Sequence, residues 1–182
     1  MTFNGDLYPS AGASVVMTTK GDMVDYNTER QRLGIGSTGQ VLAVAGGLPV
    51  WSDASSITHS IAMEIAASDE TTALTVADDK VTFRMPYNMT LNAGIAGVRA
   101  SLTTAGTTSG VTTIDIEQGG SSILSTLLTI DYGELTSYTA ATPVVVGTTA
   151  LTDNSEITVN VDVLSGGATE TGLKIQLIGT LT

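Results

Sequence analysis

Residues 155–163 read SEITVNVDV, and polar and apolar residues alternate strictly along this stretch. Successive side chains of a β-strand point to opposite faces of the sheet, so this period of two predicts a strand with one buried face. Helical periodicity is almost absent from the rest of the chain, and the stretch therefore points to an all-β fold. The residues expected to face the core are Ile157, Val159, Val161 and Val163, and those expected to face solvent are Glu156, Thr158, Asn160 and Asp162.

Three further stretches repeat this alternation, and each of them is a strand candidate. They are residues 80–86 (KVTFRMP), 111–118 (VTTIDIEQ) and 172–179 (GLKIQLIG). The apolar residues expected to face the core are Val81, Phe83, Met85, Ile114, Ile116, Leu173, Ile175 and Leu177. Other strand candidates are residues 59–66, 71–76, 89–102, 121–130 and 142–147.

Turn-forming residues separate these candidates. Gly119 and Gly120 predict a tight turn into a returning strand, and clusters of Gly, Ser, Asp and Thr follow at intervals of roughly 8 to 15 residues. Such spacing is typical of a sandwich or a barrel. The pattern therefore predicts a two-sheet antiparallel β-sandwich, jelly-roll-like and of about eight strands, over residues 57–182.

The composition predicts an aliphatic core. Hydrophobic residues make up 42% of the 182 residues, whereas aromatic residues make up 4%. Cysteine is absent, which excludes disulfides and thiolate metal sites. The sequence contains no run of about 18 apolar residues, so no membrane span is expected. The N-terminal MTFNGDLYPS has neither the basic start nor the apolar stretch of a secretion signal.

The charge is strongly acidic. Eighteen acidic and seven basic residues give a net charge of −11, and Lys174 is the only basic residue after Leu102. A surface of this kind repels phosphate, so we expect no nucleic-acid partner.

The first 56 residues differ in character from the rest. They are punctuated by glycine, carry three of the seven basic residues and hold their apolar residues in small clusters. These clusters are too sparse to enclose a core, so such a segment is expected to gain order by lying against the sandwich, another copy or a partner. We therefore expect an extended attachment segment with β-hairpins over residues 1–56 and a domain boundary near residue 56.

Residues 32–42, RLGIGSTGQVL, place Gly34, Gly36 and Gly39 at the G-x-G-x-x-G spacing of a dinucleotide-binding loop. That loop works only between a buried strand and a helix. The preceding DYNTERQR is polar, and two glycines and a proline soon follow, which ends any helix within a turn or two. Asp53 also comes too early to bind a ribose hydroxyl. The glycines are therefore interpreted as turn residues, and no nucleotide or other cofactor is expected.

Residues 18–51, TTKGDMVDYNTERQRLGIGSTGQVLAVAGGLPVW, resemble a segment that is widespread in tailed-bacteriophage virion proteins. The shared pattern is T-T-K-G-D, a short polar hairpin, R-L-x-x-G-x-x-G-Q-V-L and then a tryptophan. The second part of the chain, with KVTFRMPYNMTL and IDIEQGGSSILST, is similar to the β-sandwich that often accompanies this segment in phage genomes. The landmarks of the pattern are Lys20, Gly21, Asp22, Arg32, Leu33, Gly36, Gly39, Gln40, Val41, Leu42 and Trp51.

The resemblance implies a non-enzymatic structural protein of the virion. The short chain, without a coiled-coil stalk or repetitive shaft, favours a trimeric capsid decoration (cement) protein on the outer surface of the icosahedral shell, with the major capsid protein as its partner. The attachment segment is expected to add strands to neighbouring sheet edges by main-chain hydrogen bonds. Residues expected at the interface are Val15, Val16, Met17, Lys20, Arg30, Arg32 and Trp51.

Two of these expectations have alternatives. Trp51 anchors the segment either on the sandwich or on a neighbouring subunit. Arg30 and Arg32 either meet acidic groups of a partner or lie on an ordinary exposed hairpin.

A second hypothesis from the same resemblance is a short tail-fibre or appendage subunit whose sandwich tip binds a glycan of the host surface. It predicts a shallow exposed groove near the loops at one end of the sandwich, with aromatic residues drawn from Tyr87, Tyr132 and Tyr138. The copy number per particle separates the two hypotheses, because a shell carries hundreds of decoration proteins and only a handful of fibres.

The residues that enzymes use are scarce. With no cysteine and one histidine, a Ser–His–carboxylate triad would have to use His59, which is expected to be structural at the entrance to the sandwich. The pairs Asp69-Glu70 and Asp78-Asp79 lack the spacing of a calcium loop and are expected to cap turns between strands. Asp115 and Glu117, like Glu156 and Asp162 beside Asn160, are expected on solvated sheet faces without a pocket. We therefore expect no catalytic site, no metal and no small-molecule substrate.

Overall fold

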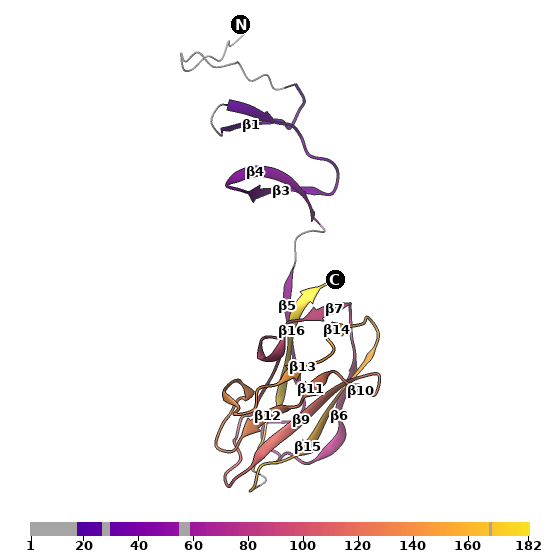
Figure 1. Ribbon diagram of the computed structural model, residues 1–182. Helices are drawn as coiled ribbons and strands as arrows, with labels where there is room; N and C mark the ends of the chain where they lie inside the picture. The colour runs from indigo at the N-terminus through magenta and orange to yellow at the C-terminus, as the bar shows by residue number, and fades with distance from the viewer. Residues whose placement is uncertain (1–17, 27–29, 55–58, 168) are drawn as a thin grey trace. The chain divides into compact units, whose positions relative to one another are not determined.

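The computed structural model describes residues 18–26, 30–54, 59–167 and 169–182. Contacts divide the chain into two units, Met1–Ile57 and Thr58–Thr182, which we call the N-terminal unit and the sandwich. All paired strands are antiparallel, so the all-β prediction is confirmed (Figure 1). Among the described residues, no helix is long and apolar enough to cross a membrane.

The sandwich contains two five-stranded sheets, and the first is built around residues 156–163. The central strand β15 (Glu156–Val163) lies between β9 and β6, and β10 and β12 both pair with β9. The other members are β6 (Ala77–Arg84), β9 (Val111–Gln118), β10 (Ser121–Ser122) and β12 (Leu128–Asp131).

The second sheet is built around β16 (Lys174–Leu181), which pairs with β5, β7 and β8. Its members are β5 (Ser60–Ala66), β7 (Met89–Leu91), β8 (Val98–Ser101) and β14 (Ala150–Leu151). A separate two-stranded sheet and two 3₁₀ helices complete the unit: β11 (Leu124–Thr126), β13 (Val145–Val146), η2 (Gly94–Ala96) and η3 (Ser137–Thr139).

One aliphatic cluster lies between the sheets. Ile114 and Ile116 of β9 and Ile175 of β16 are fully buried, as the alternation predicts. Packing such faces together removes apolar surface from water, which stabilises the fold by roughly 25 cal/mol for each Å² of apolar area buried. Loops also reach the core, since Leu74 and Ile123 are at most 2% exposed.

Strand β15 departs from the predicted alternation in two ways: one apolar residue is exposed, and two polar residues are buried. Val163 is 48% exposed, because the register of β15 against β9 shifts between Val161 and Val163 and turns the last side chain outward. Thr158 and Asn160 are buried although they are polar. Their strand has a neighbour on each side, so adjoining side chains cover them.

Several predicted strands are broken. Residues 71–76 form no strand, and Leu74 is instead held by a hydrogen bond from its N–H to the Glu170 carbonyl (2.7 Å). Residues 89–102 divide into β7, η2 and β8, and residues 121–130 into β10, β11 and β12. The described sandwich therefore has twelve strands rather than about eight, because turns and bulges interrupt apolar runs that look continuous.

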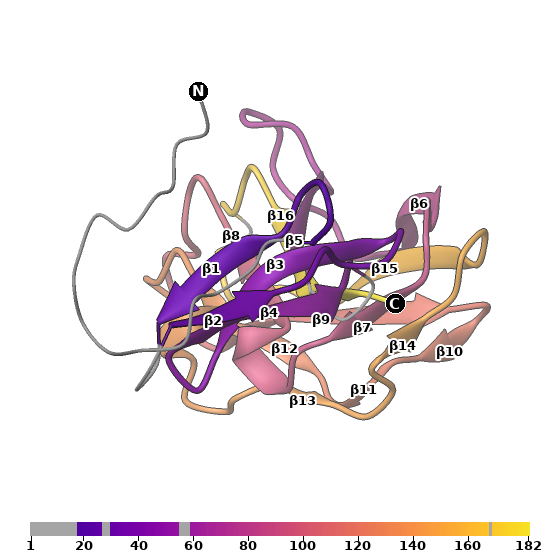
Figure 2. The same cartoon turned by 90° about the horizontal axis from the view of Figure 1, so that it is seen from above.

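The N-terminal unit contains two β-hairpins (Figure 2). The first pairs β1 (Met23–Tyr26) with β2 (Arg30–Leu33), and the second pairs β3 (Gln40–Ala45) with β4 (Leu48–Asp53). Gly46 and Gly47 form the second turn with positive φ at both positions, which suits a type I′ hairpin.

Candidate functional site

The best-defined polar site of the N-terminal unit is centred on Asp22, whose side chain is 1% exposed. Its Oδ2 accepts hydrogen bonds from the backbone N–H groups of Thr18 (3.0 Å) and Thr19 (2.9 Å). Its Oδ1 accepts one from Ile35 N–H (3.0 Å), on the far side of the first hairpin. A single carboxylate therefore joins Thr18 and Thr19, before the first hairpin, to the segment between the two hairpins.

Arg32 completes this site. Its Nη1 lies 3.1 Å from Asp22 Oδ2 and also donates to the Thr18 hydroxyl. The guanidinium, expected at an interface, thus has a partner within its own unit. Its side chain is 41% exposed, so the outer part of the group is still accessible.

The surroundings of Asp22 favour its charged form. Burial raises the pKa of the carboxyl, but hydrogen bonds from the backbone of Thr19, Ile35 and Thr18 and the charge of Arg32 outweigh it. The net effect is a pKa below the ordinary aspartate value. The N-terminal unit is therefore organised around an ionised group.

Trp51 forms the second contact between the hairpins. Its Nε1 donates to the Gly34 carbonyl (2.6 Å). A Cβ built on Gly36 would lie 2.5 Å from Trp51 Cδ2, so the indole occupies the space that a side chain at Gly36 would need. Trp51 therefore holds the segment between the hairpins, a role that the sequence did not predict.

The glycine-rich stretch forms turns. Gly39 has a φ of +87°, and the turn is closed by a hydrogen bond from Gln40 N–H to the Ser37 carbonyl (3.1 Å). The Gln40 side chain also stabilises the turn, because its Oε1 accepts a hydrogen bond from Ser37 N–H (2.9 Å). No helix follows, since residues 40–45 are strand β3. Gly39, Gln40 and Trp51 of residues 18–51 thus make contacts within their own unit.

The remaining expected interface residues are less defined. Lys20 is exposed. Val15, Val16 and Met17 lie outside the described residues, as does the side chain of Arg30.

Asp22 is the only buried residue among those of the N-terminal unit whose burial is described. The unit instead exposes apolar side chains, namely Val24 (53%), Ile35 (56%), Leu42 (48%) and Val44 (76%). Two-stranded hairpins are marginally stable without further strands or packing. The unit therefore has apolar side chains and strand edges available for another chain.

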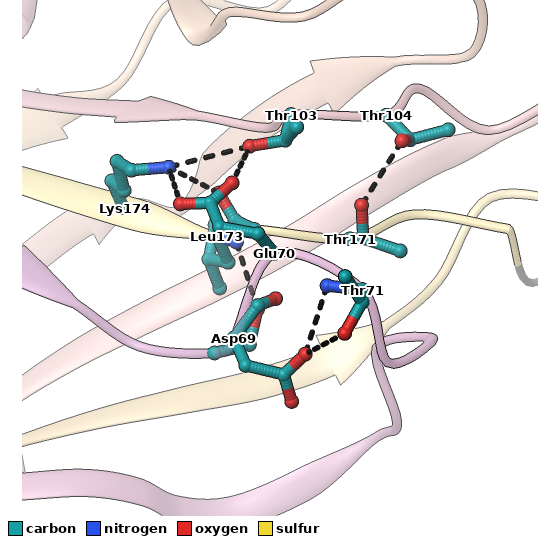
Figure 3. A network of polar contacts seen from close by, with 10 residues as sticks. Asp69, Glu70, Thr71, Thr103, Thr104, Thr171, Leu173 and Lys174 are labelled. Carbon is teal, nitrogen blue, oxygen red and sulfur yellow. Dashed lines mark hydrogen bonds and ion pairs between the residues drawn. The ribbon is translucent and has the colours of Figure 1, made fainter.

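The acidic pair Asp69-Glu70 belongs to a polar network (Figure 3) beside Lys174, where β16 begins and pairs with the last residue of β5, Ala66. Glu70 Oε1 lies 2.6 Å from Lys174 Nζ, and Glu70 also accepts from the Thr103 hydroxyl. Asp69 Oδ1 accepts from the N–H groups of Thr71 (2.8 Å) and Thr72 (2.6 Å), which makes it a turn cap as predicted.

Both carboxyls are held in their charged forms. Backbone hydrogen bonds from Thr72 and Thr71 place the pKa of Asp69 far below its usual value. Lys174 and Thr103 lower the pKa of Glu70. Each acid already has its partners, so this network ties a loop to the second sheet and offers no reactive group.

Asp78 and Asp79 lie within β6, whereas the sequence placed them between strands. The register against β15 shifts here, because Val81 pairs with Val159 and Ala77 with Val161. Asp79 adopts a φ of 52° and donates its N–H to Asn160 Oδ1 (2.9 Å). The pair therefore marks a β-bulge.

Acidic residues gather near this bulge. Burial and the charges of Asp115 and Asp78 raise the pKa of Asp162. Among the described residues, no group of three or more His, Cys, Asp or Glu side chains could hold a metal ion. The cluster is therefore a site of mutual repulsion on the outer face of the first sheet.

Glu170 is the buried carboxylate that sequence reasoning missed, because nothing in its polar surroundings in the sequence signals burial. It is fully buried, and its Oε1 accepts from the hydroxyls of Thr112 (3.0 Å) and Ser165. Oε2 has no hydrogen-bond partner. Burial raises the pKa of Glu170, but the hydrogen bonds outweigh it and lower the pKa overall.

His59 is exposed at the start of the sandwich, and its carbonyl accepts from Leu181 N–H (3.2 Å). Within the part of the chain that the structure describes, no hydrogen bond joins the His59 side chain to a serine or a carboxylate.

The three tyrosines of the glycan hypothesis do not share one end of the sandwich. Tyr132 follows β12, whose last residue Asp131 pairs with Val111 at the start of β9. Tyr87 follows β6. Near the end of β6, Phe83 pairs with Ile157 of β15, and Ile157 also pairs with Gln118, the last residue of β9. The eight residues of β9 span about 25 Å, so these two tyrosines lie at opposite ends.

Tyr138 lies on η3, and the Arg99 guanidinium stands 5.4 Å from its ring centroid. It is 64% exposed. This places one exposed aromatic side chain beside β8.

No family model, curated protein sequence or solved structure matches this chain.

Proposed function

We propose that this chain is a capsid decoration (cement) protein of a tailed bacteriophage, bound to the outer surface of the shell as a homo-oligomer. The N-terminal unit is the attachment device, and the sandwich is the outward knob. The partner on the particle is the major capsid protein. The protein has no catalytic role.

The observation that supports this function most strongly is the contrast in apolar burial. The sandwich has a complete core, whereas the described part of the N-terminal unit buries no apolar side chain and exposes four large ones. A unit that exposes apolar side chains and open strand edges is suited to β-strand addition on a neighbouring chain. The phage-like pattern of residues 18–51 belongs to this same unit.

The distribution of charge also supports the arrangement. Three basic and five acidic residues give Met1–Ile57 a net charge of −2, whereas four basic and thirteen acidic residues give Thr58–Thr182 a net charge of −9. Like charges repel between neighbouring copies. Many acidic knobs therefore stay apart on a crowded shell, while the nearly neutral unit approaches another surface at little electrostatic cost.

The test has two parts. Quantitative gel densitometry of purified particles should give hundreds of copies per shell; a handful of copies would identify a fibre instead. In the second part, shells stripped of the protein are incubated with the wild type and with Asp22→Ala, which removes the acceptor that joins Thr18 to Ile35 in the segment between the hairpins. Asp153→Ala, an exposed acid of the sandwich, is the matched control.

The expected result is that Asp22→Ala loses most binding to shells while Asp153→Ala binds like the wild type. Equal binding by all three proteins would show that the N-terminal unit is not the attachment device. The fibre hypothesis receives less support from the sandwich, because Tyr87 and Tyr132 lie at opposite ends.

A further inference from the structure

Strand β3 has an unprotected edge. Among the described residues it pairs only with β4, and its sequence QVLAVA contains neither a charged residue nor proline. Among the described strands of four or more residues, it is the only one of which this is true. Native proteins usually block free edges with charge or proline, because an open edge pairs with other strands. An edge without such protection indicates a pairing partner.

The other edges of the unit are protected. β4 carries Pro49, which has no N–H to donate, and β1 carries Asp25. β2 carries Arg30 and Arg32. The contrast within one small unit singles out β3.

The hairpin register shows which backbone groups of β3 are free to pair. Ala45 and Leu48 flank the two-residue turn, so they form a hydrogen-bonded pair, and the pairs alternate from there. Leu42 and Val44 therefore stand in non-hydrogen-bonded pairs, with Trp51 and Pro49 respectively. Their N–H and C=O groups point away from β4, toward the open edge.

We propose that β3 pairs antiparallel with β3 of a second copy of this chain. Leu42 of each copy lies opposite Val44 of the other, around a two-fold axis through Ala43. This register uses all the outward-pointing groups of both residues and forms about four backbone hydrogen bonds. The Gln40 N–H is already bonded to Ser37, so a register centred nearer the start of the strand would gain less.

The pairing also places apolar side chains together. Leu42, Val44, Pro49 and Trp51 lie on the same face of the hairpin, because cross-strand partners share a face. Two hairpins joined through β3 form a four-stranded sheet with a continuous apolar strip. Three or more strands with an apolar face reach the stability that a lone hairpin lacks. The low net charge of the unit permits two copies to meet.

A second copy fits this edge better than a ring of three. A cyclic trimer needs β3 to meet a different edge on its neighbour, and the other edges of the unit carry charge or proline. The inference replaces the expected trimer with a dimer at this contact. It stands apart from the proposed function, since self-association is measured without shells.

Single cysteines test the register directly, because the chain contains no cysteine of its own. In the proposed pairing the two copies of Ala43 form a non-hydrogen-bonded pair with Cα atoms about 4.5 Å apart, which a disulfide spans. Two copies of Ala45 lie about 13 Å apart along the strands, beyond the reach of a disulfide. Ala43→Cys is therefore expected to form a covalent dimer under oxidised glutathione, and Ala45→Cys is the matched control.

Val44→Pro tests the backbone bonds. It removes a donor that points outward and leaves the hydrogen bonds between β3 and β4 in place. Val44→Thr keeps the N–H and is its control. By light scattering and sedimentation, Val44→Pro should weaken self-association at least about tenfold, and Val44→Thr much less. Unchanged Trp51 fluorescence confirms that the hairpin is still folded.

Three results would overturn the proposal: a monomeric wild type, equal cross-linking of Ala43→Cys and Ala45→Cys, or unchanged association of Val44→Pro. The first would assign the edge to a strand of the shell or to the chain's own first residues. Failure of shell binding with dimerisation intact would instead count against the proposed function alone.

Discussion

The sandwich and the N-terminal unit hold together by opposite means. Twenty-two hydrophobic residues are buried among the described residues of the sandwich, whereas the N-terminal unit centres on the Asp22 carboxylate and the indole of Trp51. Apolar burial grows with the size of a domain, and a unit of about fifty residues with scattered apolar clusters buries too little. Polar contacts give the small unit a defined shape, while four of its large apolar side chains stay exposed.

The largest effect is expected in the sandwich core. Ile116→Ala removes a fully buried side chain between the sheets, so it should lower the free energy of unfolding by about 2–5 kcal/mol. The thermal midpoint by circular dichroism should fall by on the order of 10 °C. Trp51 fluorescence at room temperature should not change, because this single tryptophan reports only the N-terminal unit. A simultaneous change in both signals would show that the units unfold as one.

The next effect concerns the contact between the hairpins. Gly36→Ala places a Cβ 2.5 Å from Trp51 Cδ2 and must displace the indole, so the emission of Trp51 should shift to the red. Gly34→Ala is the matched control, since its Cβ meets nothing closer than Asp22 Oδ1 at 4.0 Å. Neither variant should alter the thermal midpoint of the sandwich. Identical spectra for the two variants would contradict the described position of Trp51.

Acid is expected to loosen the N-terminal unit. The pKa of Asp22 is lower in the folded chain than in the unfolded chain, so its contribution to stability is complete above the unfolded value of about 4 and is lost as the pH falls through the folded value. Trp51 emission should therefore shift below about pH 4. In Asp22→Asn the charge is absent, and the same titration should be nearly flat. A wild-type pH profile equal to that of the variant would show that ionised Asp22 does not stabilise the N-terminal unit.

The smallest effect is expected at the acidic cluster of the first sheet. Burial and the charges of Asp115 and Asp78 raise the pKa of Asp162, so the ionised form is disfavoured in the folded chain. Asp162→Asn should stabilise the sandwich by a few tenths of a kcal/mol at neutral pH. The gain should disappear in acid, where the wild type is protonated as well. Urea unfolding at two pH values measures it, and a loss of stability at pH 7 would contradict the described repulsion.

The all-β fold and the identity of the core strands followed from alternation alone. Ile114, Ile116 and Leu177 are buried where the period of two placed them. The breaks in residues 71–76 and 89–102 did not follow, because tight turns and bulges depend on which neighbouring strand satisfies the backbone. The jelly-roll connectivity stays a prediction.

The candidate site was only partly predictable. Arg32 and Trp51 were marked by their type in a chain with few basic and aromatic residues. Trp51 was expected to anchor the segment on the sandwich or on a neighbouring subunit, and Arg32 either to meet acidic groups of a partner or to lie on an exposed hairpin. Their partners within the unit, Asp22 and Gly34, come from segments ten or more residues away. Spacing along the chain carries no information on such pairings, since hairpin turns bring distant backbone groups together.

Local pattern was enough to establish strand character, an aliphatic core and an acidic surface, because each depends on residue type and period. The tertiary structure decided which strands have a neighbour on both sides and which keep an open edge. Asn160 in β15 is buried beside strands on both sides, whereas β3 has one described neighbour, β4. Strand pairing joins residues far apart in the chain, so its outcome rests on the competition among all strands and not on any one of them.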